Sequence, residues 1–552
     1  MSASAERVSS GERETNLRDG PIPLGETAAS QPVDQICTTL AIAGIAFLAI
    51  RRWMLVGPYP PGLDGAQWLA LGRGLDGQAI GRSTEGAYAP LAPVLAAIIE
   101  SITGPLLAVR LLAAASGLAV SLSIWFVARS ALGPVWGLAV TAIVIPASAL
   151  AEPALFGGYP QQFALAAGLV ALWAVCQYLT RNSGTGFSQR QETPNVPPSP
   201  GPTGRVPSGS QGSGVRPACD NAQSLWLAGI AALITSIAHH IYFPIITLAI
   251  LAAIGLWLTD RPPVKNPARV IGLLPLTLTP ACALFAAVAF AFMRAGYAAP
   301  LDASSRSFVD AWKYGTRESP ALWFVILASG IIGLAVHRRK RGDGAWLLAA
   351  SLVVPAGLLF LVSGQPRLLP PILIGAGIAA GLCAKLVASI GPQVHAAALL
   401  LALTIAATLF VPADRATAQY TDFYRVVDES LMRAATAIES DAGSGAVAVR
   451  EDRRGWPIGW WFEALLDRPV IVGSDPRWLA FPAERENARL AGALFDGLLD
   501  PGAFRQRAAV SGIRYLVVAK WDWIGWERWL TTPGFPVAKL YDDDRYLVLR
   551  VT

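Results

Sequence analysis

The stretch "AVRLLAAASGLAVSLSIWFVARSALG", residues 108–133, decides the fold class of this chain. Between Arg110 and Arg129 it carries no charged side chain, and its length approaches the about 20 apolar residues that a helix needs to cross a membrane. The whole chain shares this composition, since 53% of its 552 residues are hydrophobic and only 15% are charged, against about 25% in a soluble domain. The sequence therefore predicts a polytopic α-helical membrane protein.

Eleven apolar segments are long enough to be membrane spans. A further apolar stretch at residues 89–104 is shorter and contains Glu100, so we expect it to lie along the membrane surface. The predicted spans lie near residues 34–50, 110–128, 131–150, 159–179, 223–239, 241–258, 268–293, 320–336, 345–363, 367–384 and 394–411.

The charges predict the orientation and exclude some functions. The most basic loop, "HRRKRGD" at residues 337–343, is expected on the cytoplasmic side, where Lys and Arg are retained. With eleven spans, the N-terminus is then cytoplasmic and the C-terminus external, and the composition is typical of a bacterial inner membrane protein. The net charge of +6 is spread over many loops, so no nucleic-acid partner is predicted. The five cysteines show no spacing of a disulfide framework or zinc site.

The chain divides by composition. Residues 1–33 are predicted to form a disordered cytoplasmic tail, and residues 34–411 a transmembrane domain. Within that domain, residues 57–109 form the first external loop with amphipathic helices. Residues 181–222, rich in Pro, Gly and Ser, are predicted to form a disordered cytoplasmic linker. In residues 412–552 short β-rich runs alternate with helical patterns, which predicts a soluble extracytoplasmic α/β domain.

The order of features between residues 57 and 180 carries a family resemblance. An acid in "LDGAQ" at 63–67 is followed by "YAPLAPVLAAIIESITG" at 88–104, by a span that starts near an arginine, and by "AEPALFGGYPQ" at 151–161. This order resembles the GT-C superfamily of membrane glycosyltransferases, which includes the protein mannosyltransferases and the bacterial aminoarabinose transferases. The resemblance implies many spans followed by an external α/β domain.

The resemblance also implies roles for three residues. It places Asp64 on the catalytic acid of the first external loop, Arg110 on the arginine at the start of the next span, and Glu152 on the second acid. The implied reaction moves a sugar from a polyprenyl-phosphate donor to an extracytoplasmic lipid, cell-envelope glycan or protein. Such a transfer needs a base near the acceptor hydroxyl and cationic groups for the departing phosphate, within reach of membrane lipids.

Four further residues are candidates for substrate binding. Arg367 in "SGQPRLLPP" resembles the arginine that opens a late span in these enzymes, and a guanidinium can hold two phosphate oxygens. His239 and His240 in "AHHIYFP" could bind a divalent metal ion or the lipid phosphate. Tyr159 in "GGYPQ" is the fourth.

Structural interpretations stay open beside these roles. Asp64 also suits the N-cap of a surface helix, and Glu152 suits a helix end. Arginines at span ends can extend to the lipid headgroups, and adjacent histidines on one helix point about 100° apart. Two other functions also remain, a non-catalytic membrane protein that binds envelope glycans and a transporter or lipid flippase.

Overall fold

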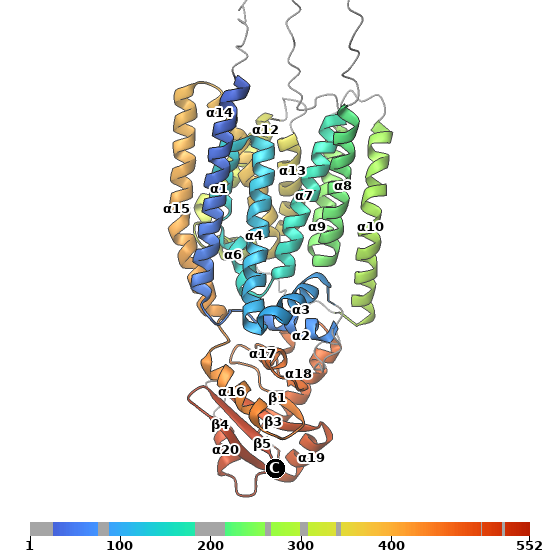
Figure 1. Cartoon of the computed structure of the whole chain (residues 1–552), viewed down its shortest axis with the longest axis vertical. Coiled ribbons are helices and arrows are strands. Elements are labelled where there is room, and N and C mark those ends of the chain that lie inside the picture. The colour runs from blue at the N-terminus through green and yellow to red at the C-terminus, as the bar shows by residue number, and fades with distance from the viewer. Residues whose placement is uncertain are drawn as a thin grey trace, which may run out of the picture.

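The computed structural model describes residues 26–75, 88–182, 216–259, 267–297, 307–337, 344–497, 499–520 and 525–552. Most of the predicted tail and linker lies outside the described residues. The molecule has two parts, a long helical bundle and a smaller α/β domain at one end, which holds the C-terminus (Figure 1).

The bundle confirms the predicted fold class. In the described residues, ten helices are long and apolar enough to cross a membrane, and the pair α5 (Pro134–Val144) and α6 (Ser148–Phe156), bent by 58°, makes an eleventh. The ten are α1 (Glu26–Val56), α4 (Pro105–Leu132), α7 (Tyr159–Asn182), α8 (Arg216–Ala238), α9 (Tyr242–Thr259), α10 (Pro267–Arg294), α12 (Pro320–His337), α13 (Gly344–Ser363), α14 (Leu369–Ala388) and α15 (Pro392–Tyr424).

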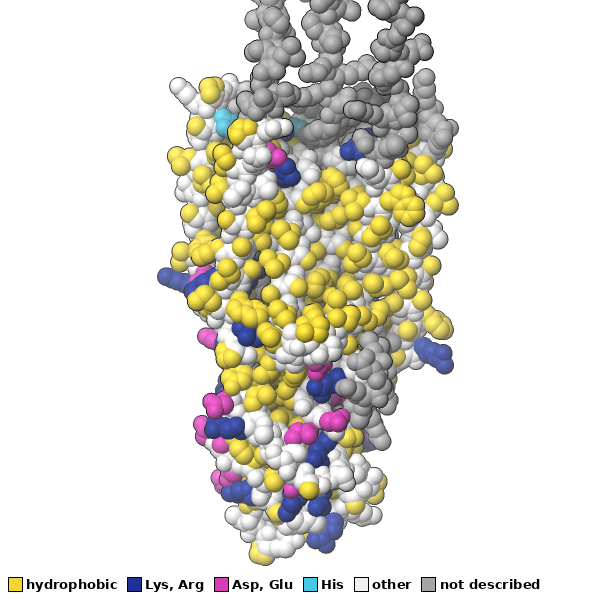
Figure 2. All heavy atoms as spheres, viewed as in Figure 1, with side chains coloured by type: hydrophobic (Ala, Val, Ile, Leu, Met, Phe, Trp, Pro, Cys, Tyr) yellow, Lys and Arg dark blue, Asp and Glu magenta, His cyan; other side chains and the backbone are white. Residues whose placement is uncertain are grey.

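The bundle is packed around its middle helices and exposes apolar side chains outward. Helices α7 and α14 are the most buried of the spans, whereas α1, α10 and α15 lie at the periphery. Figure 2 shows hydrophobic side chains over the bundle, while acidic and basic side chains gather over the C-terminal domain. A surface of this kind is what lipid chains require, since they offer no hydrogen bonds to polar groups.

Two short helices of the first loop lie between the bundle and the C-terminal domain (Figure 1). Helix α2 spans Asp64–Leu75 and α3 spans Leu91–Thr103. Helix α3 has 13 residues and is too short to cross a bilayer, which agrees with its expected place at the surface. The short helices α11 (Phe308–Gly315) and η2 (Pro366–Leu368) follow later in the chain.

The C-terminal domain contains one five-stranded sheet in the order β2-β1-β3-β5-β4. Strands β1 and β2 are parallel, as are β1 and β3, whereas β5 runs antiparallel to both β3 and β4. Helix α15 enters this domain without a break and passes the predicted boundary at residue 412. The strands are β1 (Ala446–Val449), β2 (Val470–Val472), β3 (Ile513–Ala519), β4 (Val537–Asp542) and β5 (Tyr546–Val551).

Helices cover the sheet and join it to the first loop. Side chains on one face of β1, Val447 and Val449, belong to a core that also contains Leu69 of α2 and Trp461 of α17. The domain is therefore packed onto the first loop through a continuous apolar core. The remaining elements are α16 (Glu429–Ser440), α17 (Gly459–Leu465), η3 (Pro476–Trp478), α18 (Pro482–Phe495), α19 (Pro501–Val510) and α20 (Trp526–Thr531).

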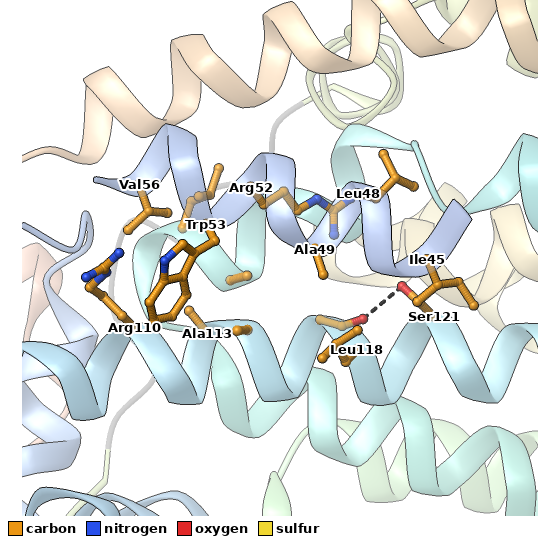
Figure 3. Close-up of a pocket in the computed structure, with 14 residues that line it drawn as sticks. Ile45, Leu48, Ala49, Arg52, Trp53, Val56, Arg110, Ala113, Leu118 and Ser121 are labelled. Carbon is orange, nitrogen blue, oxygen red and sulfur yellow. Dashed lines mark hydrogen bonds between the residues drawn. The ribbon is translucent and has the colours of Figure 1, made fainter. Parts of the chain in front are cut away.

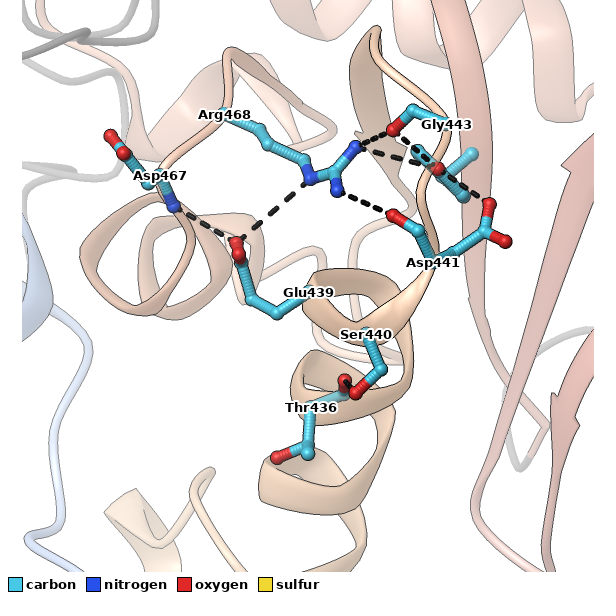
Figure 4. Close-up of polar contacts among 8 residues, drawn as sticks. Thr436, Glu439, Ser440, Asp441, Gly443, Asp467 and Arg468 are labelled. Atoms are coloured by element: carbon cyan, nitrogen blue, oxygen red, sulfur yellow. Dashed lines mark hydrogen bonds and ion pairs between the residues drawn. The ribbon is translucent and has the colours of Figure 1, made fainter.

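The turn from α16 into β1 is fixed by one arginine (Figure 4). Arg468 donates hydrogen bonds to the carbonyl oxygens of Asp441, at 2.9 Å, and of Gly443. Glu439 accepts a hydrogen bond from the Asp467 amide at 3.0 Å. These contacts tie the residues just before β2 to the end of α16.

Candidate functional site

The backbone around Asp64 is pressed against the end of α6. Gly62 has a φ of +99°, and a Cβ there would lie 2.5 Å from the carbonyl carbon of Phe156. Gly157 has a φ of +105°, and a Cβ there would lie 2.4 Å from the amide nitrogen of Gly65. Two glycines are needed because L side chains rarely adopt this conformation and no room exists for them. The close approach fixes where the α2 helix starts.

Three hydrogen bonds from distant segments hold the same backbone. The Gly62 amide donates to the Tyr424 carbonyl at 2.9 Å, and the Trp461 indole donates to the Gly62 carbonyl at 2.9 Å. The Trp68 indole donates to the Gly157 carbonyl at 2.6 Å. Segments from α2, α6, α15 and α17 therefore meet at Asp64, so the position of its carboxylate is set by the whole fold.

The Asp64 carboxylate lacks the contacts of a structural acid. In the described part of the chain, no hydrogen-bond donor or ion-pair partner reaches it. Burial raises the pKa of Asp64 to about 6, although the charge of Arg367 acts in the opposite direction. An N-cap aspartate would instead accept a hydrogen bond from an amide of the first turn. The environment suits a base with a pKa near the working pH.

Tyr159 lies next to this carboxylate. It begins α7 and is fully buried, and its hydroxyl has no hydrogen-bond partner within the described ranges. A Cβ at Gly65 would lie 3.1 Å from that hydroxyl. Buried hydroxyls are nearly always bonded, so a hydroxyl beside an acid and without a partner among the described residues makes Tyr159 one of the candidate groups of this site.

His239 and His240 lie in the short non-helical segment between α8 and α9. Their rings stack with centroids 4.9 Å apart, and His239 Nδ1 accepts a hydrogen bond from the Ile241 amide at 3.2 Å. On one continuous helix the two side chains would point about 100° apart, but between the two helices their rings can lie side by side. Burial, together with the charge of Arg367, lowers the pKa of His240 to about 4 and lowers that of His239 as well. Both rings are therefore neutral at physiological pH.

The charge of Arg367 acts on both the histidines and Asp64. Arg367 lies in η2 before α14, and its carbonyl accepts a hydrogen bond from the Tyr242 hydroxyl at 2.7 Å. Its exposed guanidinium has no carboxylate within ion-pair distance among the described residues, yet its charge acts on Asp64, His239 and His240. A cation, a carboxylate and two neutral imidazoles thus share one region.

The C-terminal domain adds an acid that the sequence did not single out. Glu484 at the start of α18 is 2% exposed, and its Oε1 accepts hydrogen bonds from Gln67 and Tyr88, both at 3.1 Å. Its Oε2 accepts from the amides of Ala480 and Phe481. Burial raises the pKa of Glu484 to about 7. A capping acid three residues after Phe481 is visible in the sequence, but its contact with the first loop is not.

Tyr88 connects this acid to the Asp64 region. Burial and the negative charges of Glu484 and Asp64 raise the pKa of Tyr88. Its ring packs edge-on against Trp68, Phe292 and Phe481. The site is therefore bordered by aromatic rings from the first loop, the bundle and the C-terminal domain.

Glu152 and Arg110 lie outside this group. Glu152 Oε1 accepts hydrogen bonds from the hydroxyls of Tyr314 and, at 2.6 Å, Tyr424. It thus ties α6 to α11 and α15. Arg110 stacks on Trp53 of α1, with its guanidinium carbon 3.9 Å from the ring centroid. The structure brings together Asp64, Tyr159, Arg367 and the two histidines, but not these two residues.

A metal ligand set is not formed by the described residues. No three His, Cys, Asp or Glu side chains within them could hold one ion. His239 and His240 offer two ring nitrogens at most, so any ion there would need ligands from a substrate or from the rest of the chain. The possible divalent metal stays a prediction.

Known structures share this fold. No protein-family model matches the sequence, and no curated protein matches it significantly. The oligosaccharyltransferase AglB of Archaeoglobus fulgidus, in complex with an inhibitory peptide and a dolichol-phosphate, is similar with a TM-score of 0.58 and 11% identity, over 90% of this chain and 70% of that one. ArnT of Cupriavidus metallidurans in the apo state is similar with a TM-score of 0.57 and 12% identity, over 93% of this chain and 98% of that one.

Two further structures extend the comparison. ArnT bound to undecaprenyl phosphate gives a TM-score of 0.53 and 11% identity, over 92% of this chain and 97% of that one. The mycobacterial arabinofuranosyltransferase AftD gives a TM-score of 0.54 and 14% identity, over 92% of this chain and 41% of that one. The resemblance to the GT-C superfamily is therefore confirmed at the level of the fold.

Proposed function

We propose that this chain with the GT-C fold is a glycosyltransferase, which moves a sugar from a polyprenyl-phosphate donor to an extracytoplasmic acceptor with Asp64 as the base. The observation that carries the proposal is the Asp64 carboxylate, which has no donor among the described residues and a pKa of about 6, in the field of Arg367. The structures that share the fold include one in complex with a dolichol-phosphate and one with undecaprenyl phosphate, which supports a donor of this kind.

Each group has a chemical role in this reaction. Asp64 accepts the proton of the acceptor hydroxyl as the new glycosidic bond forms. The bond between the sugar and the phosphate breaks, and the guanidinium of Arg367 holds the oxygens of the departing lipid phosphate. The neutral rings of His239 and His240 and the hydroxyl of Tyr159 can donate further hydrogen bonds to donor or acceptor. The acceptor is a lipid, an envelope glycan or a protein that carries a hydroxyl group.

The distribution of charges supports an external position for the site. Arg129, Arg181 and Lys385 end α4, α7 and α14 at the end of the bundle away from the C-terminal domain (Figure 1). Because Lys and Arg are retained on the cytoplasmic side, that end is cytoplasmic and the C-terminal domain is external. In a bacterial plasma membrane the site then faces the side on which envelope glycans are built.

The proposal is tested by transfer assays on the reconstituted full chain. Wild type and Asp64→Asn are incubated with labelled polyprenyl-phosphate sugars and a membrane extract as acceptor. Loss of a positioned base is expected to lower the rate by about 10²- to 10⁴-fold. Asp496→Asn, the same change at an exposed aspartate directly after α18, serves as the matched control and should keep the wild-type rate. Equal rates for wild type and a folded Asp64→Asn protein would refute the role of Asp64.

A further inference from the structure

A groove between α1 and α4 contains two arginines that the proposed reaction does not use (Figure 3). Arg52 comes from α1 and Arg110 from α4, and the rest of the lining is almost wholly apolar. The side of α4 that bears Arg110 is turned by about 100° from the side that faces the Asp64 loop. Val109 faces Gly65 of the Asp64 loop, whereas Arg110, the next residue, turns toward Trp53.

The positive charges of the groove lack acidic partners. The Arg110 Nε atom is buried, and among the described residues no acceptor reaches it. Arg52 donates one hydrogen bond, at 3.2 Å, to the Ile145 carbonyl. Within the described ranges neither arginine has a carboxylate at ion-pair distance. Their neighbour Arg51 differs, because it forms a two-point ion pair with Asp414 at 3.1 and 3.0 Å.

The two guanidinium groups lie at different depths. Arg110 is near the start of α4, at the end of the bundle where lipid headgroups are expected. The guanidinium of Arg52 lies beside Gly117, where an added Cβ would be 3.8 Å from its Nη1 atom. Gly117 is seven residues after Arg110, or about 10 Å further along the helix. A ligand that contacts both must carry an anion at one end and acceptor oxygens below it.

The apolar part of the groove fits one leaflet. From Ile45 to Val56 the lining of α1 extends about 16 Å at 1.5 Å per residue. This is about half of the roughly 30 Å hydrocarbon core of a bilayer. Uncompensated cations next to hydrocarbon are costly, so an anionic ligand is favoured over a zwitterionic one, whose own cation the arginines would repel.

We propose that this groove binds an anionic glycerophospholipid. Its phosphate contacts Arg110, its ester oxygens accept hydrogen bonds from Arg52, and one acyl chain lies between α1 and α4. The bound lipid joins α1 to α4 just before the chain leaves α1 at Val56 toward the Asp64 loop. This site is independent of the proposed sugar transfer, and its test needs no turnover.

Binding is measured on the purified full chain by native mass spectrometry. Phosphatidylglycerol, phosphatidylethanolamine, undecaprenyl phosphate and inorganic phosphate are each titrated against wild type, Arg110→Gln and the Arg52→Gln/Arg110→Gln double variant. Wild type should prefer phosphatidylglycerol, and Arg110→Gln should weaken its binding about tenfold or more, as expected for lost charge-assisted hydrogen bonds. Arg51→Gln is the matched control at the same depth, and it should bind like wild type.

Several outcomes would overturn the proposal. These are equal phosphatidylglycerol binding by wild type and the double variant, equal binding of phosphatidylethanolamine, or an equal loss in Arg51→Gln. Undecaprenyl phosphate bound more tightly than phosphatidylglycerol and lost in Arg110→Gln would make the groove a donor site. If inorganic phosphate alone displaces phosphatidylglycerol, the acyl chain contributes nothing to binding and the groove is not a lipid site. Should the arginine variants not fold, Gly117→Leu, which fills the groove and keeps both charges, must weaken phosphatidylglycerol binding.

Discussion

Asp64 and Glu152 are both acids in short helices at the ends of spans, yet their surroundings differ. Two tyrosine hydroxyls donate to Glu152, whereas no donor among the described residues reaches Asp64. Tyr424 links the two, because its hydroxyl donates to Glu152 and its carbonyl accepts from the Gly62 amide beside Asp64. A carboxylate with its hydrogen bonds made holds the fold, while one left without them is available to a substrate.

After the loss of Asp64 itself, removing the cation whose charge acts on this acid should have the largest effect. Arg367→Gln is expected to lower the transfer rate by about 10²- to 10³-fold, since the developing phosphate charge loses its main partner. Arg367→Lys should recover only part of the rate, because an ammonium cannot hold two oxygens in the planar geometry of a guanidinium. Rates and polyprenyl-phosphate affinity are measured together. Unchanged values for Arg367→Gln would assign the phosphate contact elsewhere.

Glu152→Gln should act on stability more than on chemistry. Loss of the charged acceptor for Tyr314 and Tyr424 is expected to reduce the free energy of unfolding by about 1–3 kcal/mol. Thermal unfolding in detergent measures this change, and the transfer rate of the folded fraction should fall far less than in Asp64→Asn. If Glu152→Gln loses activity without losing stability, Glu152 takes part in the reaction and the comparison fails.

Glu484→Gln probes the contact between the C-terminal domain and the first loop. A glutamine keeps the shape but weakens the bonds from Gln67, Tyr88 and the capped amides, so a loss of about 1 kcal/mol is expected. The same substitution at exposed Glu486, which among the described residues pairs only with Arg489 at the surface, should change stability by less than about 0.5 kcal/mol. Hydrogen exchange of α2 reports the contact directly, and unaltered exchange in Glu484→Gln would show that the domain does not hold the loop through this acid.

A gain in stability is predicted when the unpaired acid is neutralised. The folded pKa of Asp64, about 6, exceeds the ordinary aspartate value of about 3.9, so the unfolded state loses its proton first. This group therefore destabilises the fold as pH rises from about 4 to about 6, and the full penalty persists above that. Asp64→Asn should unfold at a slightly higher temperature than wild type at pH 7, with no gain at pH 4. A lower unfolding temperature at pH 7 would contradict the account.

The sequence predicted the spans and part of the site, for reasons that are local. Apolar length defines each span, and the short stretch before Gly104 was recognised because it cannot cross a bilayer. The site residues that sequence could not assign depend on tertiary contacts. Val109 and Arg110 are consecutive and point about 100° apart, so the sequence alone could not determine which of them faces Asp64. Glu484 follows the first loop by about four hundred residues, and only folding brings it to Tyr88.

The pH dependence of sugar transfer by wild type and Asp64→Asn tests the central claim most directly. We predict that the wild-type rate rises with pH through an apparent pKa near 6, as the Asp64 carboxylate loses its proton and can act as the base. The residual rate of Asp64→Asn should be at least a hundredfold lower, as for a lost base, and should lack this step. An Asp64→Asn protein that keeps the wild-type rate, or the same step near pH 6, would show that another group is the base.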